Sequence, residues 1–333
     1  MTVASRRKRF AGRAISVASM CGLIVNLVPA AAAVAPAYPT KPIRVIVTST
    51  PGSGPDIMAR LIGHKLTEAW GQQIVVDNRA GASGTIGADI AARSTPDGYT
   101  LMIMTAQHAI VASMFEKLNY DLVKSFSPIS LVASTPFILV VNPSVRATSV
   151  KELVALAKSK PGSLHFGSGG SGSPPHLSAE IFKSMTGIDL VHVPYKGVTP
   201  ALTDTVSGQV QMTFAVIPAC LPLIKTGKVR ALGVTSAKRT PLVPDLPTIS
   251  ESVPGYEFIG WYGLVAAGKP PPEIISKLNV EVVRAVKTSE LQERISSLGA
   301  EPIGSAPPEL ASHIRAQMHK MQLAVKASGA HRE

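Results

Sequence analysis

The sequence predicts an α/β protein with two lobes, joined by two crossover strands that form a hinge. Three observations lead to this prediction. Strand-like and helix-like runs alternate along the chain, and the alternation starts again after Asn142-Pro143. The elements that follow the second series contain too few strands for a third sheet. They are therefore expected to pack back onto the first series, so that the chain crosses between lobes twice.

The first 37 residues are typical of a secretory signal. They contain five Lys and Arg residues near the start and no acidic residue, followed by an apolar run over 14–28 and then small residues. The apolar run is shorter than the ~20 residues that a permanent membrane span needs. We expect residues 1–37 to be removed on export, with cleavage near Ala37. Ala33 and Ala35 are alternative cleavage sites.

Composition narrows the possible functions of the exported chain. Loss of 1–37 removes five of the 33 basic residues and none of the 21 acidic ones, so the formal charge falls from +12 to +7. The remaining basic residues form no run interleaved with aromatics, so nucleic acid is not an expected partner. Cys220 is then the one cysteine, and we predict a free, buried thiol. The sequence has no zinc-type cysteine spacing and no His-Glu-x-x-His, so neither a metal nor a cofactor is expected.

The first series of elements has the order of a parallel sheet. A nearly continuous β-branched run at 43–49 predicts a strand buried on both faces. Pro55 fits the first turn of the helix that follows to Trp70. The next expected elements are a strand at 73–77, a helix at 85–93 and a strand at 100–105. This β-α-β-α-β order predicts helices on both faces of the sheet.

The second series begins at a strand over 137–141. Ser149 followed by Glu152 three residues later predicts a capping box at the start of a helix to Lys160. The remaining expected strands are 164–166, 190–194, 211–216 and 229–235, and the expected helices are 174–186 and 199–207.

Four prolines then interrupt the pattern and predict a return linker over 240–256. The elements expected after it are a strand at 257–267 and amphipathic helices at 271–287 and 307–327. If these pack on the first series, the chain crosses between lobes near residues 140 and 238. The predicted lobes are therefore 38–140 with 239–333, and 141–238.

Two glycine-rich loops are candidate binding elements. One spans 50–56 and the other 167–174, and each joins the carboxyl end of a strand to a helix. Open α/β sheets bind ligands at this edge, and the free N–H groups at a helix start attract an anion without a charged side chain. Both loops are explained equally well as tight turns between a strand and a helix.

Other chemistry has weaker support. The second loop fits G-x-G-x-x-G through Gly167, Gly169 and Gly172, but the acidic residue that follows, Asp189, opens a strand instead of ending one, which argues against a dinucleotide site. No G-x-S-x-G elbow occurs. We therefore predict no catalytic residues.

Five further residues are singled out by their place in the pattern. His108 and His176 follow strand ends and could line the cleft, although a lone histidine is more often structural. Asp56 lies in the first helical turn and is interpreted as a capping residue. Trp261 and Tyr262 interrupt a glycine-rich strand, where they could wall a pocket or simply pack in the core.

Several motifs together resemble the Bug-type solute receptors, the periplasmic subunits of tripartite tricarboxylate transporters. The motifs that carry the resemblance are the run 38–44, Pro51-Gly52 with Asp56, Asn78-Arg79, the run 96–101, Phe166–Gly169, the run 192–197, Pro200–Asp204 and the run 227–232.

The resemblance implies a two-lobed periplasmic-binding-protein fold of type II and a receptor that is not an enzyme. It implies capture of a small organic acid in the inter-lobe cleft and its delivery to integral membrane permease subunits. We expect a monomer located in the periplasm. Together with the pattern above, the resemblance suggests these ligand-binding residues: Thr50, Pro51, Gly52, Ser53, Gly54, Thr105, Gln107, His108, Ser168, Gly169, Gly170, Ser171, Tyr195, Lys196, Ala215 and Trp261.

The chain also departs from the family pattern. Ser53 replaces a second glycine and Pro55 replaces a hydroxyl residue in the first loop. Ala215 stands where the family often has an aspartate, and it offers no carboxylate to an amino group. We therefore expect a carboxylic acid that lacks a positive amine. The alternative function is an exported enzyme that acts on an anionic substrate on the same scaffold, and a pure scaffold protein is the third possibility.

Overall fold

The computed structural model describes residues 38–115 and 117–328, so the predicted export signal lies outside the described residues. The strands are β1 (Ile43–Val47), β2 (Ile74–Asn78), β3 (Thr100–Thr105), β4 (Phe126–Val141), β5 (His165–Ser168), β6 (Val191–Pro194), β7 (Met212–Val216), β8 (Arg230–Val234), β9 (Ile259–Ala267) and β10 (Glu301–Pro302).

The α-helices are α1 (Gly54–Trp70), α2 (Thr85–Ala92), α3 (Ala106–Met114), α4 (Val150–Ser159), α5 (Pro174–Thr186), α6 (Val198–Ser207), α7 (Ile217–Lys225), α8 (Pro272–Val286), α9 (Ser289–Ser297) and α10 (Pro307–Ser328), and the short 3-10 turns are η1 (Ala82–Gly84) and η2 (Ile249–Glu251). Within the described residues, no helix is both long enough and apolar enough to cross a bilayer.

The first half of the sheet is built on β1, whose apolar side chains are mostly buried. β1 pairs in parallel with β2 on one side and β3 on the other, as the β-α-β-α-β order predicts. β3 then pairs antiparallel with β9, so the sheet is mixed. The core of this half contains β-branched and leucine side chains of the strands packed against α1 and α8.

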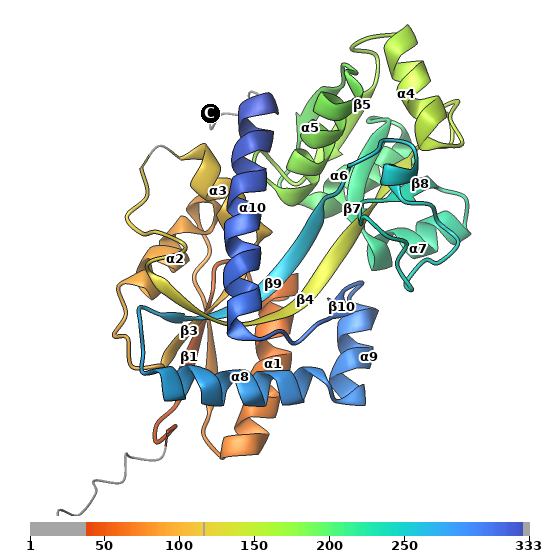
Figure 1. Cartoon of the computed structure of the whole chain (residues 1–333). Helices are drawn as coiled ribbons and strands as arrows, with labels where there is room; N and C mark the ends of the chain where they lie inside the picture. The colour runs from red at the N-terminus through yellow and green to blue at the C-terminus, as the bar shows by residue number, and fades with distance from the viewer. Residues whose placement is uncertain (1–37, 116, 329–333) are drawn as a thin grey trace, which may run out of the picture. The chain divides into compact units, whose positions relative to one another are not determined.

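Two long neighbouring strands connect the halves of the sheet (Figure 1). β4 pairs with β9 from Phe126 as far as Pro136, and from Phe137 onward it pairs with β7. β4 and β9 therefore run side by side where the chain passes from one half to the other, which confirms the predicted pair of crossover strands. The sequence predicted only 137–141 of β4, because Pro128 and Pro136 argue against a central strand.

The second half of the sheet repeats the α/β pattern. β5 pairs in parallel with β6 and β7, while β7 and β8 pair antiparallel with β4. The predicted capping box is present, because the Ser149 side chain accepts a hydrogen bond from the Glu152 amide. The aromatic core of this half includes Tyr256, the last residue of the predicted linker, and Phe258, which follows it. The exact boundaries of the two lobes stay a prediction.

The sequence predicts that the last helix, α10, packs on the first half of the sheet alone. In the structure α10 packs against both halves. It contacts α3 and α5 and runs alongside both in Figure 1. Leu310 and Ile314 are buried in one core cluster, whereas Met321 and Val325 are buried in the cluster of the second half. Any relative movement of the halves must therefore be accommodated by α10 as well as by the crossover strands.

Three helices were not expected from the sequence, and each has a local reason. α7 contains Pro218 and Pro222, residues that normally signal a turn. α3 follows β3 directly, with Thr105 serving both as the last strand residue and as the helix N-cap. α9 is short and polar on average, and among its residues only Leu291 and Ile295 are buried.

Candidate functional site

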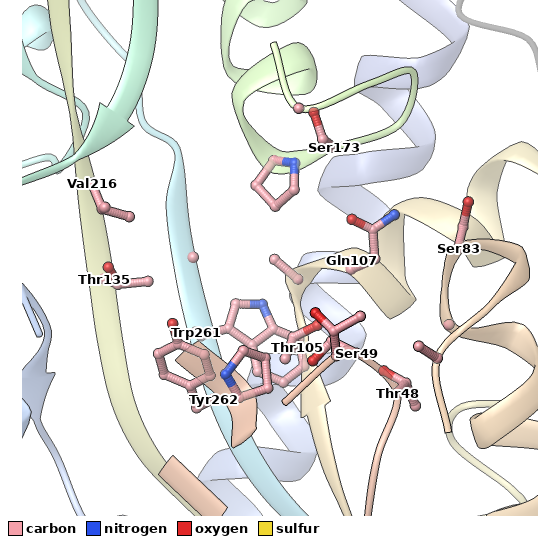
Figure 2. Close-up of a pocket in the computed structure, with 18 of the residues that line it drawn as sticks. Thr48, Ser49, Ser83, Thr105, Gln107, Thr135, Ser173, Val216, Trp261 and Tyr262 are labelled. Atoms are coloured by element: carbon pink, nitrogen blue, oxygen red, sulfur yellow. The ribbon is translucent and has the colours of Figure 1, made fainter. Parts of the chain in front are cut away.

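A cavity of about 490 Å³ lies where the crossover strands meet the loops of both halves of the sheet (Figure 2). Its volume falls within the range of small-molecule sites. The lining residues are Thr48, Ser49, Thr50, Pro55, Ala80, Gly81, Ser83, Gly84, Thr105, Ala106, Gln107, Thr135, Phe137, Gly169, Ser171, Ser173, Pro174, Val216, Gly260, Trp261 and Tyr262.

The lining combines hydroxyl groups with apolar walls and contains no charged side chain among the described residues. Ser173 lies on the α5 side of the cavity, and Trp261, Tyr262 and Thr105 lie across from it in Figure 2. Val216 and Thr135 lie on another side. A ligand in this cavity can receive hydrogen bonds and apolar contacts, but it cannot form an ion pair with a lining residue.

Several helices begin at the cavity. Thr105, Ser173 and Val216 line the cavity and are the N-cap residues of α3, α5 and α7. Gly84 precedes α2, and Pro55 lies in the first turn of α1. The start of a helix has unpaired N–H groups and a partial positive charge. Five such starts around one cavity favour an anion without any cationic side chain.

Asp56, in the first turn of α1, holds the first glycine-rich loop in place through hydrogen bonds. Its carboxylate accepts the Gly52 N–H at 2.9 Å and a side-chain N–H of Asn78 at 3.0 Å, and it pairs with Arg60 at 3.0 Å. Burial by itself raises the pKa of Asp56, but the hydrogen bonds from Arg60, Gly52 and Asn78 outweigh it and lower the pKa below its usual value. Asp56 therefore stays ionised in the first turn of α1, where the helix dipole favours a carboxylate, and it does not line the cavity.

His108 performs a similar task between β1 and β3. Its Nδ1 accepts the Thr105 N–H at 3.0 Å, and its Nε2 lies 3.2 Å from the Thr48 hydroxyl. The side chain is fully buried, and burial lowers the pKa of His108 to about 4. His108 is thus a neutral group behind the wall that holds Thr48 and Thr105 in place. It does not line the cavity, contrary to the sequence-based expectation.

The second glycine-rich loop is held at alternate amides. The Gly170 N–H donates to the Ser168 hydroxyl at 3.1 Å, and the Gly172 N–H donates to His176 Nδ1 at 3.1 Å. The residues before, between and after them, Gly169, Ser171 and Ser173, line the cavity.

Ser168 also lies 2.6 Å from His192 Nε2, the spacing of a nucleophile and its base. Ser168 is completely buried and is absent from the cavity wall, so a substrate cannot reach it. The pair supports the loop and offers no accessible nucleophile.

The structure brings six of the sixteen predicted site residues to the cavity wall: Thr50, Thr105, Gln107, Gly169, Ser171 and Trp261. Seven others do not line it: His108 lies in α3, and six lie in the two glycine-rich loops, namely Pro51, Gly52, Ser53, Gly54, Ser168 and Gly170. Ser53, for example, turns its hydroxyl toward Ser49 at 2.7 Å.

Three predicted residues lie away from the cavity. Tyr195 donates its hydroxyl to Asp204 at 2.7 Å, and Lys196 is exposed. Ala215 is completely buried among apolar residues of the second half, on the opposite face of β7 from the cavity. Because side chains alternate along a strand, the next residue, Val216, is the one that lines the cavity.

Sequence reasoning missed several cavity residues. Thr135, Phe137 and Gly260 belong to the crossover strands, and of these three only Thr135 lies outside the strands predicted from the sequence. Ser83 and Gly84 lie in a run of small residues after β2, and that run was an available signal for a third glycine-containing loop.

A family model described as a tripartite tricarboxylate transporter family receptor matches residues 58–330. The chain is similar to BugT of Bordetella pertussis, with 35% identity over 298 residues that cover 88% of this chain and 91% of BugT.

Solved structures are also similar. Rpa4515 of R. palustris with adipate has a TM-score of 0.78 and 37% identity, and the match covers 88% of this chain and 98% of that chain. MatC from Rhodopseudomonas palustris with bound malate has a TM-score of 0.74 and 31% identity, with 86% of this chain and 100% of that chain covered. These structures confirm the predicted two-lobed α/β architecture.

Proposed function

Because the chain belongs to the tripartite tricarboxylate transporter receptor family, we propose that it captures a small organic carboxylate in the periplasm and delivers it to membrane permease subunits. The resemblance predicted from the sequence is confirmed by this membership. The similar structures with bound adipate and malate support a carboxylate ligand. The single observation on which the proposal depends most is an uncharged cavity surrounded by helix starts.

The cavity also supports a narrower choice of ligand. A carboxylate is stabilised by the helix starts and by hydroxyl donors such as Thr48 and Thr105. A protonated amine has no carboxylate to pair with on the cavity wall that the structure describes. The ligand is therefore an acid without a positive amine. The whole cavity lining supports this choice of ligand, whereas Ala215 lies away from the cavity.

The apolar part of the wall favours an acid with a carbon skeleton over a small inorganic anion. Phe137, Val216 and Trp261 offer surface against which methylene groups can pack. Burial of such groups contributes about 25 cal/mol per Å². A ligand that has both a carboxylate and methylene groups is therefore stabilised by the helix starts and by the apolar side chains of the same cavity.

Ligand binding is coupled to the relative position of the two halves. Both halves contribute to the cavity wall, through Thr105 on one side and Ser173 on the other. A ligand that contacts both favours the closed arrangement, and the crossover strands act as the hinge. Delivery to the permease then uses the closed form as the signal that the receptor is loaded.

An enzyme on the same scaffold has less support. The described residues contain no cluster of His, Cys, Asp and Glu that could hold a metal ion. Ser168, which pairs with His192 close to the cavity, is itself buried behind the wall. We therefore propose a receptor that does not transform its ligand.

A thermal-shift screen of the mature protein tests the proposal. Adipate, malate and a set of other carboxylic acids are compared with glutamate and aspartate. A ligand that binds only the folded state raises the melting temperature, by an amount set by RT ln(1 + [L]/Kd). We expect stabilisation by simple acids and no consumption of the acid after prolonged incubation. Stabilisation by none of the acids contradicts the receptor function, and turnover supports the enzyme.

The delivery step needs a separate experiment in living cells. Uptake of the labelled acid is measured before and after deletion of the gene for this protein. We expect uptake to be lost and then restored by the intact gene. Unchanged uptake argues that the receptor serves another purpose, such as sensing.

A further inference from the structure

The two glycine-rich loops end in the same local structure, although they lie in opposite halves of the sheet. Each has a glycine with positive φ, +79° at Gly52 and +73° at Gly172, followed by a serine N-cap. The backbone angles of Ser53 and Ser173 are nearly equal, with φ of −73° and −71°. Proline occupies the first turn of the helix in both cases.

In both loops the third helical residue reaches back to the glycine. Asp56 of α1 accepts the Gly52 N–H at 2.9 Å, and His176 of α5 accepts the Gly172 N–H at 3.1 Å. The side chain thus uses one of the N–H groups that would otherwise be unpaired and fixes the loop against its helix. The anchoring group is a carboxylate in one loop and an imidazole in the other.

The surroundings of the two anchors differ in charge. Asp56 is balanced by Arg60 at 3.0 Å. His176 is 6% exposed and stacks on His192 with ring centroids 4.1 Å apart. The Glu180 carboxylate lies 3.9 Å from His176 Nε2 and already pairs with Lys183 at 3.0 Å. A carboxylate at position 176 would therefore have no cation left to balance it.

The hydrogen bond itself requires an uncharged ring. His176 Nδ1 accepts the Gly172 N–H, so Nδ1 cannot carry a proton. Burial, followed by the neighbouring His192 and Lys183, lowers the pKa of His176 to about 3, in agreement with this geometry. The position at the start of a helix acts in the same direction, because the helix dipole disfavours a cation there.

We propose that His176 is a positioning residue of the ligand site, which fixes the second loop through the Gly172 amide while adding no charge beside an anionic ligand. This inference depends on the proposed function as far as the anion is concerned. The neutral anchor holds Gly172 so that the neighbours Ser171 and Ser173 stay on the cavity wall. One charged anchor, Asp56 with its arginine, and one neutral anchor leave the cavity free of net negative charge.

Three substitutions separate the acceptor from the charge. His176→Asn keeps a neutral acceptor close to the position of Nδ1, His176→Leu removes the acceptor, and His176→Asp keeps an acceptor but adds a negative charge. Dissociation constants for adipate are measured by calorimetry at low and high salt. Hydrogen exchange of the amides from Gly169 to Ser173 is measured without ligand, and ¹⁵N NMR of the wild-type protein reports which ring nitrogen of His176 is protonated.

We expect the Asn variant to bind adipate within about threefold of the wild type, because the hydrogen bond is kept. The Leu variant should bind about tenfold more weakly and exchange the Gly172 amide faster, since a buried donor loses its partner. The Asp variant should keep slow exchange but bind about tenfold more weakly at low salt, with a smaller loss at high salt. NMR should show Nδ1 unprotonated and Nε2 protonated.

Other results would overturn the inference. Equal exchange and affinity in the Leu and Asn variants would exclude an anchoring role, and equal affinity in the Asp and Asn variants would exclude the charge argument. If the Leu variant does not fold, comparison of the Asn and Asp variants still tests the charge argument. If the wild type does not bind adipate or any other acid, the proposed function fails and the charge argument fails with it. The anchoring role is then decided by the exchange and NMR results alone.

Discussion

Buried His108 should make the stability of the folded protein fall in mild acid. The ordinary histidine pKa is 6.5, and burial lowers the pKa of His108 to about 4 in the folded chain. Between these two values the unfolded chain binds a proton that the folded chain does not, so unfolding is favoured as the pH falls. The contribution is fully present above pH 6.5 and is progressively lost as the pH drops toward 4.

The size of the effect follows from the two pKa values. One pKa unit corresponds to about 1.36 kcal/mol, and at pH 5.0 about 1.5 units of the difference have been lost. His108 alone therefore accounts for about 2 kcal/mol of lost stability between pH 7.5 and pH 5.0. Replacement by asparagine removes this titration. It also lowers the absolute stability, so the pH dependence of each protein and not its stability at one pH is the quantity to compare.

Urea unfolding of the ligand-free protein measures the free energy of unfolding at the two pH values. Between pH 7.5 and 5.0, His108→Asn should lose about 2 kcal/mol less than the wild type. His64→Asn is the matched control, because the His64 side chain is 68% exposed, and it should behave as the wild type does. Equal losses in the His108 variant and the wild type would refute the claim that His108 is a neutral buried group.

Four further outcomes are expected. Val216→Asp places a carboxylate on the cavity wall, and calorimetry should show acid binding weakened at least tenfold, because like charges a few ångströms apart repel by about 2–4 kcal/mol. Gly54→Ala puts a Cβ 2.5 Å from the Tyr262 hydroxyl, so chemical unfolding should show a loss of about 1–3 kcal/mol, and an unchanged stability would mean that Tyr262 moves freely. Mass spectrometry of the exported protein should find its first residue at or close to Tyr38, whereas an intact N-terminus would contradict the signal prediction. Cys220 is fully buried and burial raises its pKa to about 12, so a thiol reagent should react slowly with the native protein and rapidly after denaturation.

The architecture could be predicted from local patterns because it depends on them. The alternation of β-branched runs and amphipathic stripes located most strands and helices, including β3 and α5. The long strand β4 was underestimated because prolines normally exclude central strands. Pro136 is tolerated there because it stands where β4 changes its partner from β9 to β7. Pairing partners are a property of the whole fold, and a single strand does not reveal them.

The candidate site was predictable only at the level of loops. Glycine content and position after a strand located the two main loops, yet they did not tell which residues of a loop face the cavity. Gly169 and Ser171 line it, while Gly170 and Gly172 between and after them bind protein acceptors. That alternation is set by side chains such as His176 that approach from the helix. The face of the sheet on which a strand residue lies depends on the register of the strand. For this reason Val216 lines the cavity and its neighbour Ala215 does not.

The most direct test of the central claim is a calorimetric titration of ligand-free mature protein with adipate and with its neutral diamide. The two compounds have similar shape, but only the acid carries the charge that the helix starts would stabilise. The account predicts binding of the acid with one site per chain and binding of the diamide at least about tenfold weaker. Equal binding of the two compounds would contradict recognition of an anion by an uncharged cavity.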